Sequence, residues 1–78
     1  FPHSSQRKLT VDEVTGLGGD VAQDAINEIY ARHGYVFKTK SIQKYYESQS
    51  WYHKNYNFSE SDFSEIESYN IGLLRKYN

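Results

Sequence analysis

Two polar side chains, His33 and Asn70, stand out because a helical wheel places each one inside the apolar stripe of its helix. A buried imidazole or amide must find a hydrogen-bond partner, or its burial costs about 1–3 kcal/mol. We therefore expect His33 and Asn70 to belong to one buried polar network that joins the second helix to the last. Two other roles stay open for the pair, contact with a ligand at the floor of a pocket and ligation of a metal ion.

Glu28 and Arg32 add a charged pair on the same helix as His33. They are four residues apart with the acidic residue first, which is the favourable order for an ion pair on a helix. Arg32 also lies near the end of the helix, where its guanidinium can stack on a tyrosine or donate to loop carbonyl groups. We assign Glu28 and Arg32 to the structural polar network together with His33 and Asn70.

The aromatic-rich run of residues 51–58 is the second feature that could do chemistry. Aromatic residues make up 17% of the chain, and eight of them are tyrosines, which can face a ligand as easily as a core. Aromatic faces stack on sugars or peptides, and neighbouring lysines attract anionic polymers. The predicted binding residues are Trp51, Tyr52, Tyr56, Lys44 and Lys54.

The motifs of the common catalytic and metal sites are missing from the sequence. His3, His33 and His53 are too widely spaced for a zinc motif, and there is no cysteine for a thiolate site. The glycines of residues 16–19 lack the lysine of a phosphate-binding loop, and no serine stands in a nucleophile-elbow motif. We expect no catalytic residues, no metal site and no cofactor.

Length and charge narrow the class of protein further. A chain of 78 residues forms one domain, and a net charge of −1 argues against a nucleic-acid partner bound through its phosphates. No apolar run approaches the ~18 residues of a membrane span, so we expect no membrane insertion. Residues 1–8 are polar and lack periodicity, which indicates a flexible linker or arm before a single domain over residues 9–78. Because the sequence starts with Phe1 and contains no methionine, we expect it to be part of a longer or processed protein.

Capping signals predict the helices that position these residues. Thr10 and Glu13 form a capping-box pattern for a short first helix. Asp20 is the predicted N-cap of the second helix, and Gly34 is the left-handed residue that ends it. The third helix is predicted to begin at Thr39 or Ser41, and its predicted inner face consists of Ile42, Tyr45, Tyr46 and Gln49.

The last helix is predicted to be the longest, with Ser59 or Ser61 as its N-cap and an end near Tyr77. Gly72 lies opposite its apolar stripe, either as a tolerated residue or as a site of close approach by the 51–58 loop. The predicted inner stripe is Phe63, Ile66, Asn70, Leu74 and Tyr77, with Glu67 and Leu73 at its edges. The fold class is therefore all-α, a compact small bundle of about four helices with little or no sheet.

The string YARHG at residues 30–34 is the motif from which the YARHG domain family takes its name. The block NEI at residues 27–29 and the tyrosine and tryptophan pairs within residues 45–52 resemble neighbouring family motifs. Residues 67–71 resemble the family's E-x-x-N-I ending. The resemblance covers roughly residues 9–77.

This resemblance implies a bacterial extracellular domain that is appended to membrane-anchored or exported proteins. We therefore expect a non-catalytic extracytoplasmic binding module of a larger surface protein, with a cell-wall polymer, another envelope component or a partner protein as its ligand. A structural spacer or oligomerisation domain without a ligand is the alternative. An enzyme with a deep pocket around His33 is a third hypothesis.

Overall fold

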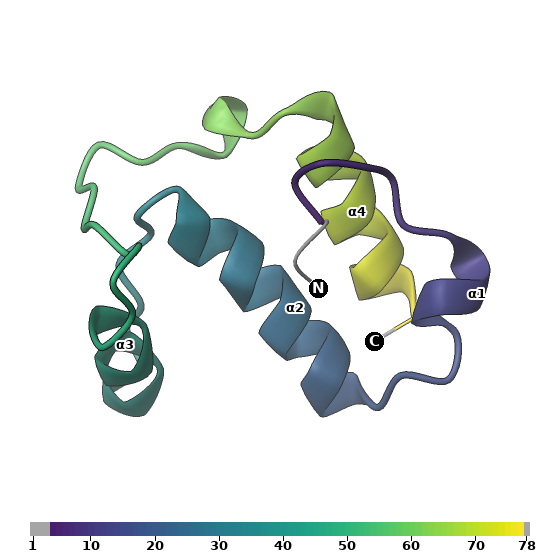
Figure 1. Cartoon of the computed structure of the whole chain (residues 1–78), viewed down its shortest axis with the longest axis horizontal. Helices are drawn as coiled ribbons and strands as arrows, with labels where there is room; N and C mark the ends of the chain where they lie inside the picture. Colours follow the sequence, from purple (N-terminus) through teal and green to yellow (C-terminus); the bar gives the residue numbers. More distant parts are fainter. Residues whose placement is uncertain (1–3, 78) are drawn as a thin grey trace.

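Helices α2 and α4 pack against each other and form the centre of the fold (Figure 1). The computed structural model describes residues 4–77, and this part of the chain is helical without any β-strand. The prediction of a compact all-α fold with a short first helix is thus confirmed. The elements are α1 (Val11–Val14), α2 (Gly19–Arg32), α3 (Lys40–Glu47), the 3₁₀ helix η1 (Glu60–Asp62) and α4 (Glu65–Lys76).

The main hydrophobic core lies between α2 and α4. Ile29 of α2 and Leu74 of α4 are completely buried, and Val14 of α1 closes one end of this core. Each such side chain contributes about 1.5–3 kcal/mol relative to an exposed position. The other buried members are Leu9, Ala22, Ala25, Ile26 and Ile71.

Most of the predicted helix boundaries are confirmed, including Thr39 as the N-cap of α3 and an end of α4 at Tyr77, but two N-caps are wrong. Thr10 and Glu13 form the expected capping box of α1. Asp20 is not the N-cap of α2, because the helix begins at Gly19, two residues earlier than predicted, and Gly18 is the N-cap. Asp20 instead lies in the first turn, where the helix dipole favours its negative charge.

The last helix begins later than predicted. Ser59 caps the 3₁₀ helix η1, whereas Ser64 caps α4 in a capping box with Glu67. As a result α4 has 12 residues and α2, with 14 residues, is the longer helix. The buried stripe of α4 consists of Glu67, Asn70, Ile71 and Leu74. Glu67 and Ile71 thus lie inside, while the predicted inner residue Phe63 precedes the helix.

Gly34 follows the end of α2, and the 51–58 loop approaches the backbone closely at this glycine. One of the two roles considered for Gly72 was such a close approach. The φ of Gly34 is +83°, as predicted for a left-handed residue after a helix. A Cβ atom at Gly34 would overlap the carbonyl oxygen of His53, and the Asn55 N–H donates to the Gly34 carbonyl at 2.9 Å. Nothing lies within 4 Å of the position of a Cβ at Gly72. The 51–58 loop therefore folds back on the end of α2 and does not approach Gly72 of α4.

Helix α3 stands apart from the α2–α4 pair, at the end of α2 where the chain turns (Figure 1). A second, smaller core joins it to α2 through Ala31, Tyr46 and Tyr52. Phe37 and Ile42 pack against this cluster from its edge. The short α3 therefore depends on a few aromatic contacts for its position.

Residues 4–8, expected to belong to a flexible arm, are packed against α4. Asn70 is completely buried and binds this segment through three hydrogen bonds, which we call the Asn70 clamp. Its amide donates to the carbonyl oxygens of Ser4 (2.7 Å) and Arg7 (2.9 Å), and its Oδ1 accepts from the Leu9 N–H at 2.7 Å. The rest of the predicted arm, residues 1–3, lies outside the described residues.

Candidate functional site

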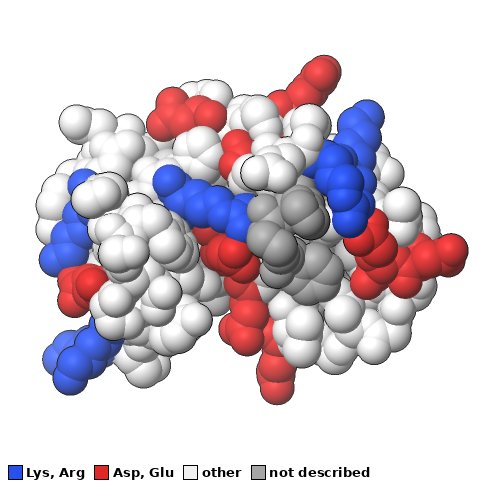
Figure 2. All heavy atoms as spheres, in the orientation of Figure 1, with Lys and Arg blue, Asp and Glu red and all other residues white. Residues whose placement is uncertain are grey.

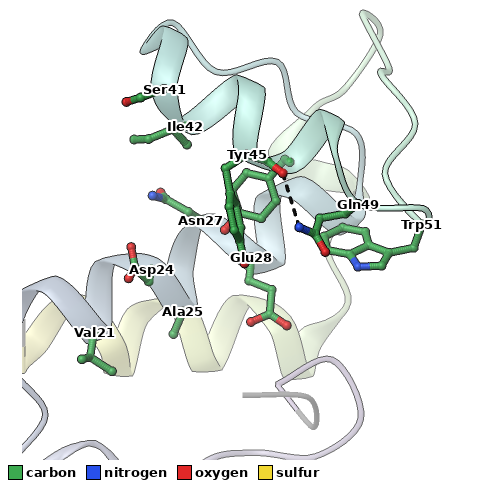
Figure 3. Close-up of a pocket in the computed structure, with 11 residues that line it drawn as sticks. Val21, Asp24, Ala25, Asn27, Glu28, Ser41, Ile42, Tyr45, Gln49 and Trp51 are labelled. Carbon is green, nitrogen blue, oxygen red and sulfur yellow. Dashed lines mark hydrogen bonds between the residues drawn. The ribbon is translucent and has the colours of Figure 1, made fainter.

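A groove of about 700 Å³ separates α3 from α2 and is the candidate binding site of this chain (Figure 3). One wall comes from α2, and the other comes from α3 and the residues that follow it. Of the six large hydrophobic residues that are exposed in residues 4–77, three line this groove, namely Val21, Tyr45 and Trp51. The full lining is Val21, Asp24, Ala25, Asn27, Glu28, Ser41, Ile42, Tyr45, Tyr46, Gln49 and Trp51.

Three aromatic rings shape the α3 side of the groove. Tyr46 is buried, and its ring stacks on Phe37 with 5.1 Å between the ring centroids. Tyr45 packs edge-on against Tyr46 at 5.0 Å, and Trp51 meets the same ring at 6.0 Å. Tyr45 stays 60% exposed and Trp51 43% exposed. The buried ring thus holds two open aromatic faces at the groove.

Tyr45 was predicted to lie on the inner face of its helix, and this prediction is wrong. Neighbouring residues on a helix point about 100° apart, so only one ring of the Tyr45–Tyr46 pair can enter the second core. Tyr46 takes that place because it reaches Ala31 and Tyr52. Tyr45 is thereby left at the surface, where a ligand can reach it.

The α2 side of the groove is acidic. Asp24 and Glu28 lie one turn apart on this wall, and the lining contains no lysine or arginine. Burial raises the pKa of Tyr46 to about 12, and the negative charges of Glu28 and Asp24 add to this rise. The groove therefore combines open aromatic faces with negative potential.

Polar side chains complete the lining. Glu28 is ion-paired with Arg32, as the sequence predicted. The Asn27 Oδ1 accepts a hydrogen bond from Gln23 at 2.9 Å. The Gln49 side chain donates to the Tyr45 carbonyl oxygen at 3.4 Å, the contact drawn as a dashed line in Figure 3. Asp24 has no ion-pair or hydrogen-bond partner within residues 4–77.

The predicted binding residues are not gathered in one place. Trp51 lines the groove, whereas Tyr52 is buried in the second core and lies outside the groove lining. Its hydroxyl donates to the Tyr35 carbonyl oxygen at 2.7 Å. Tyr56 is 80% exposed and lies outside the groove lining.

The two predicted lysines also lie outside the groove lining. Lys54 is ion-paired with Glu47 at 2.9 Å, and this contact raises the pKa of Lys54 and lowers that of Glu47. Lys44 is exposed on α3. Over the face seen in Figure 2, acidic and basic side chains are dispersed and do not gather in one large patch of a single sign.

A second constellation joins the end of α2 to α4 through Glu67. His33 Nε2 lies 2.9 Å from Glu67 Oε1, and the Ser5 hydroxyl donates to Glu67 Oε2 at 2.6 Å. Burial alone would raise the pKa of Glu67, but hydrogen bonds from Ser5, the Ser64 N–H and His33 hold it below its usual value. Glu67 is the central acceptor of this network, although the helical wheel placed it only at the edge of the apolar stripe of its helix.

The four predicted network residues reach different partners. His33 contacts Glu67, whereas Asn70 binds the N-terminal segment through the Asn70 clamp. Arg32 donates to the hydroxyl groups of Ser4 and Ser5 at 2.7 and 2.9 Å and also pairs with Glu28. The network therefore joins α2 to α4 directly through His33 and Glu67 and indirectly through residues 4–5, and it holds the N-terminal segment in place.

The described residues, 4–77, contain no group of three His, Cys, Asp or Glu side chains that could hold a metal ion. Within the same range, no helix has the length and apolar character needed to cross a membrane.

The YARHG domain family matches the sequence over residues 1–78. No curated protein and no solved structure matches the chain.

Proposed function

Because the chain belongs to the YARHG domain family, we propose that it is a non-catalytic binding module of a larger bacterial surface protein, and that the α2–α3 groove binds its ligand. The ligand on this proposal is a component of the cell envelope or a partner protein. The extracytoplasmic location rests on the family resemblance described above.

The exposed aromatic faces in the groove carry this proposal. Tyr45 and Trp51 remain open to solvent although a buried ring nearby fixes their positions. Large rigid side chains of this kind contribute contact area at a low cost in conformational entropy. Apolar surface kept open beside polar side chains is typical of a binding site.

The surroundings of His33 support the non-catalytic part of the proposal. Its Nε2 is engaged by Glu67, and its ring packs edge-on against Phe63 at 5.0 Å. Both carboxylate oxygens of Glu67 accept further hydrogen bonds, from Ser64 and Ser5. A general base needs a free nitrogen or oxygen within reach of a substrate proton. These groups are instead used to join α2, α4 and the N-terminal segment.

The proposal is tested by an NMR titration of the isotope-labelled domain with solubilised cell-wall fragments, an anionic wall polymer and an extract of envelope proteins. We expect shifts at the Trp51 indole N–H and at the amides of Tyr45 and Gln49. Tyr45→Ala should weaken the response, while Tyr56→Ala, which removes a more exposed ring outside the groove, should not.

A titration that leaves every groove amide unmoved would contradict the proposal. The structural spacer would then be favoured, and sedimentation at several concentrations would separate a monomeric spacer from an oligomerisation domain.

A further inference from the structure

We infer that the α2–α3 groove takes a lysine-bearing peptide segment of a partner protein, whose ammonium groups are attracted by Asp24 and by the faces of Tyr45 and Trp51. This inference rests on the proposed function and names the chemical class of the ligand.

Charge complementarity is the first reason. The groove is lined by two carboxylates and by no basic side chain. Glu28 already pairs with Arg32, whereas Asp24 has no partner within residues 4–77. An unpaired carboxylate beside open aromatic surface favours a cation and disfavours an anionic polymer.

The aromatic rings are the second reason. The face of a tyrosine or tryptophan ring carries negative charge density that attracts an ammonium group. Tyr45 and Trp51 both contact the buried Tyr46, so neither ring has to be ordered when the ligand binds. Figure 3 shows Tyr45 and Trp51 on the opposite side of the groove from Asp24 and Glu28.

The remaining lining suits a peptide chain. Val21, which is exposed, and Ile42 offer apolar surface for the four-carbon stem of a lysine. The side chains of Asn27 and Gln49 can donate to and accept from a peptide backbone. The groove therefore has apolar surface for the stem, a carboxylate for the ammonium group and amides for the main chain.

A second, smaller hollow on this molecule is lined by charges of the opposite sign. It has a volume of about 460 Å³, and its lining includes Lys38 and Arg75 but no carboxylate. One of its two tyrosines, Tyr30, is already hydrogen-bonded within the protein. The Tyr30 hydroxyl donates to Glu60 at 2.6 Å and accepts from Arg75 at 2.9 Å. A cationic segment is repelled there, so charge directs it to the α2–α3 groove.

The test uses two end-capped peptides, Gly-Lys-Gly-Lys-Gly and a copy in which both lysines are acetylated at Nζ. Each is titrated into the labelled domain at low salt and followed by amide shifts and Trp51 fluorescence. We expect the lysine peptide to move the groove signals and the acetylated copy to bind at least about tenfold more weakly, because acetylation removes the charge.

Matched variants locate the site. Asp24→Asn should weaken binding of the lysine peptide by about tenfold, whereas Asp20→Asn makes the same change in net charge on the same helix outside the groove and should change it less than about twofold. Tyr45→Leu removes the ring and keeps an apolar side chain, and it should also weaken binding. Asp24 and Tyr45 are both exposed, so circular dichroism should show folded variants.

Equal affinity for the two peptides, equal effects of the two aspartate variants, or shifts confined to other surfaces would overturn the inference. If cell-wall glycan fragments move the groove signals and the lysine peptide does not, the inference fails while the proposed function stands. If no probe moves them, both fail.

Discussion

Replacement of Asn70 by alanine should remove much of the stability of this domain. The side chain is completely buried and makes three hydrogen bonds, at 2.7, 2.7 and 2.9 Å, to backbone groups of residues 4–9. Each bond contributes about 1 kcal/mol, and backbone groups left buried without a partner add a further cost. We expect a loss of about 3–4 kcal/mol. A domain of 78 residues has roughly 4–12 kcal/mol in total.

Urea unfolding followed by far-ultraviolet circular dichroism measures this loss. Asn57→Ala is the control, because Asn57 is exposed and its side chain makes no hydrogen bond within residues 4–77. Asn70→Asp is a second variant, since it keeps the size and the acceptor oxygen but loses the two bonds that the amide nitrogen donates. It should lose about 2 kcal/mol or more.

A chain that lacks residues 1–8 separates the Asn70 clamp from other effects. Without Ser4 and Arg7, Asn70 has only the Leu9 N–H of its three partners, so Asn70→Ala should cost much less in this background. A loss below about 1 kcal/mol in the full chain, or an undiminished loss in the shortened chain, would refute the role given to the clamp.

Three further predictions concern other parts of the molecule. Gly34→Ala should destabilise the fold by more than about 2 kcal/mol in urea unfolding, because φ is +83° and the new Cβ would overlap His53. Gly72→Ala, with open space at the same atom, should be neutral or stabilising by up to about 1 kcal/mol, and equal losses for the two would contradict this. The pKa of Glu67 is held below 4.5, so its carboxylate stabilises the folded state above pH 4.5 and this contribution is lost as the pH falls further. Thermal melts should therefore show a smaller loss of Tm below pH 4.5 for Glu67→Gln than for the parent chain, and parallel curves would contradict this. Amide hydrogen exchange should be faster in α3 than in α2 and α4, since α3 depends on the small second core, and equal protection would disprove it.

The local features of the fold were predictable from the sequence because they depend on a few neighbouring residues. The capping box of Thr10 and Glu13 and the turn at Gly34 are of this kind. The start of α4 was not predictable in this way, because two successive serine–acid pairs compete there. Ser59 and Ser64 both form capping boxes, and the first one closes only a 3₁₀ turn.

The candidate site was only partly predictable because it depends on how α3 is placed. Trp51 was expected to face a ligand and does line the groove. Its neighbour Tyr52 points the other way, into the second core. Asp24 could not be identified as a site residue from the sequence, because one exposed carboxylate on a helix resembles any other solvated charge. Its place in the groove depends on the position of α3 on the opposite side. Glu67 was missed for the reverse reason, although its place three residues after Ser64 in a capping box was a usable signal.

The Asn70 clamp also sets an order of events during synthesis of the chain. Ser4 and Leu9 leave the ribosome early, but Asn70 follows them by 66 and 61 residues. Residues 4–9 are therefore made before their partner Asn70 and dock only after α2 is already available. Until then the carbonyl and amide groups of this segment are bonded to water, so the element that begins the domain is among the last to be fixed.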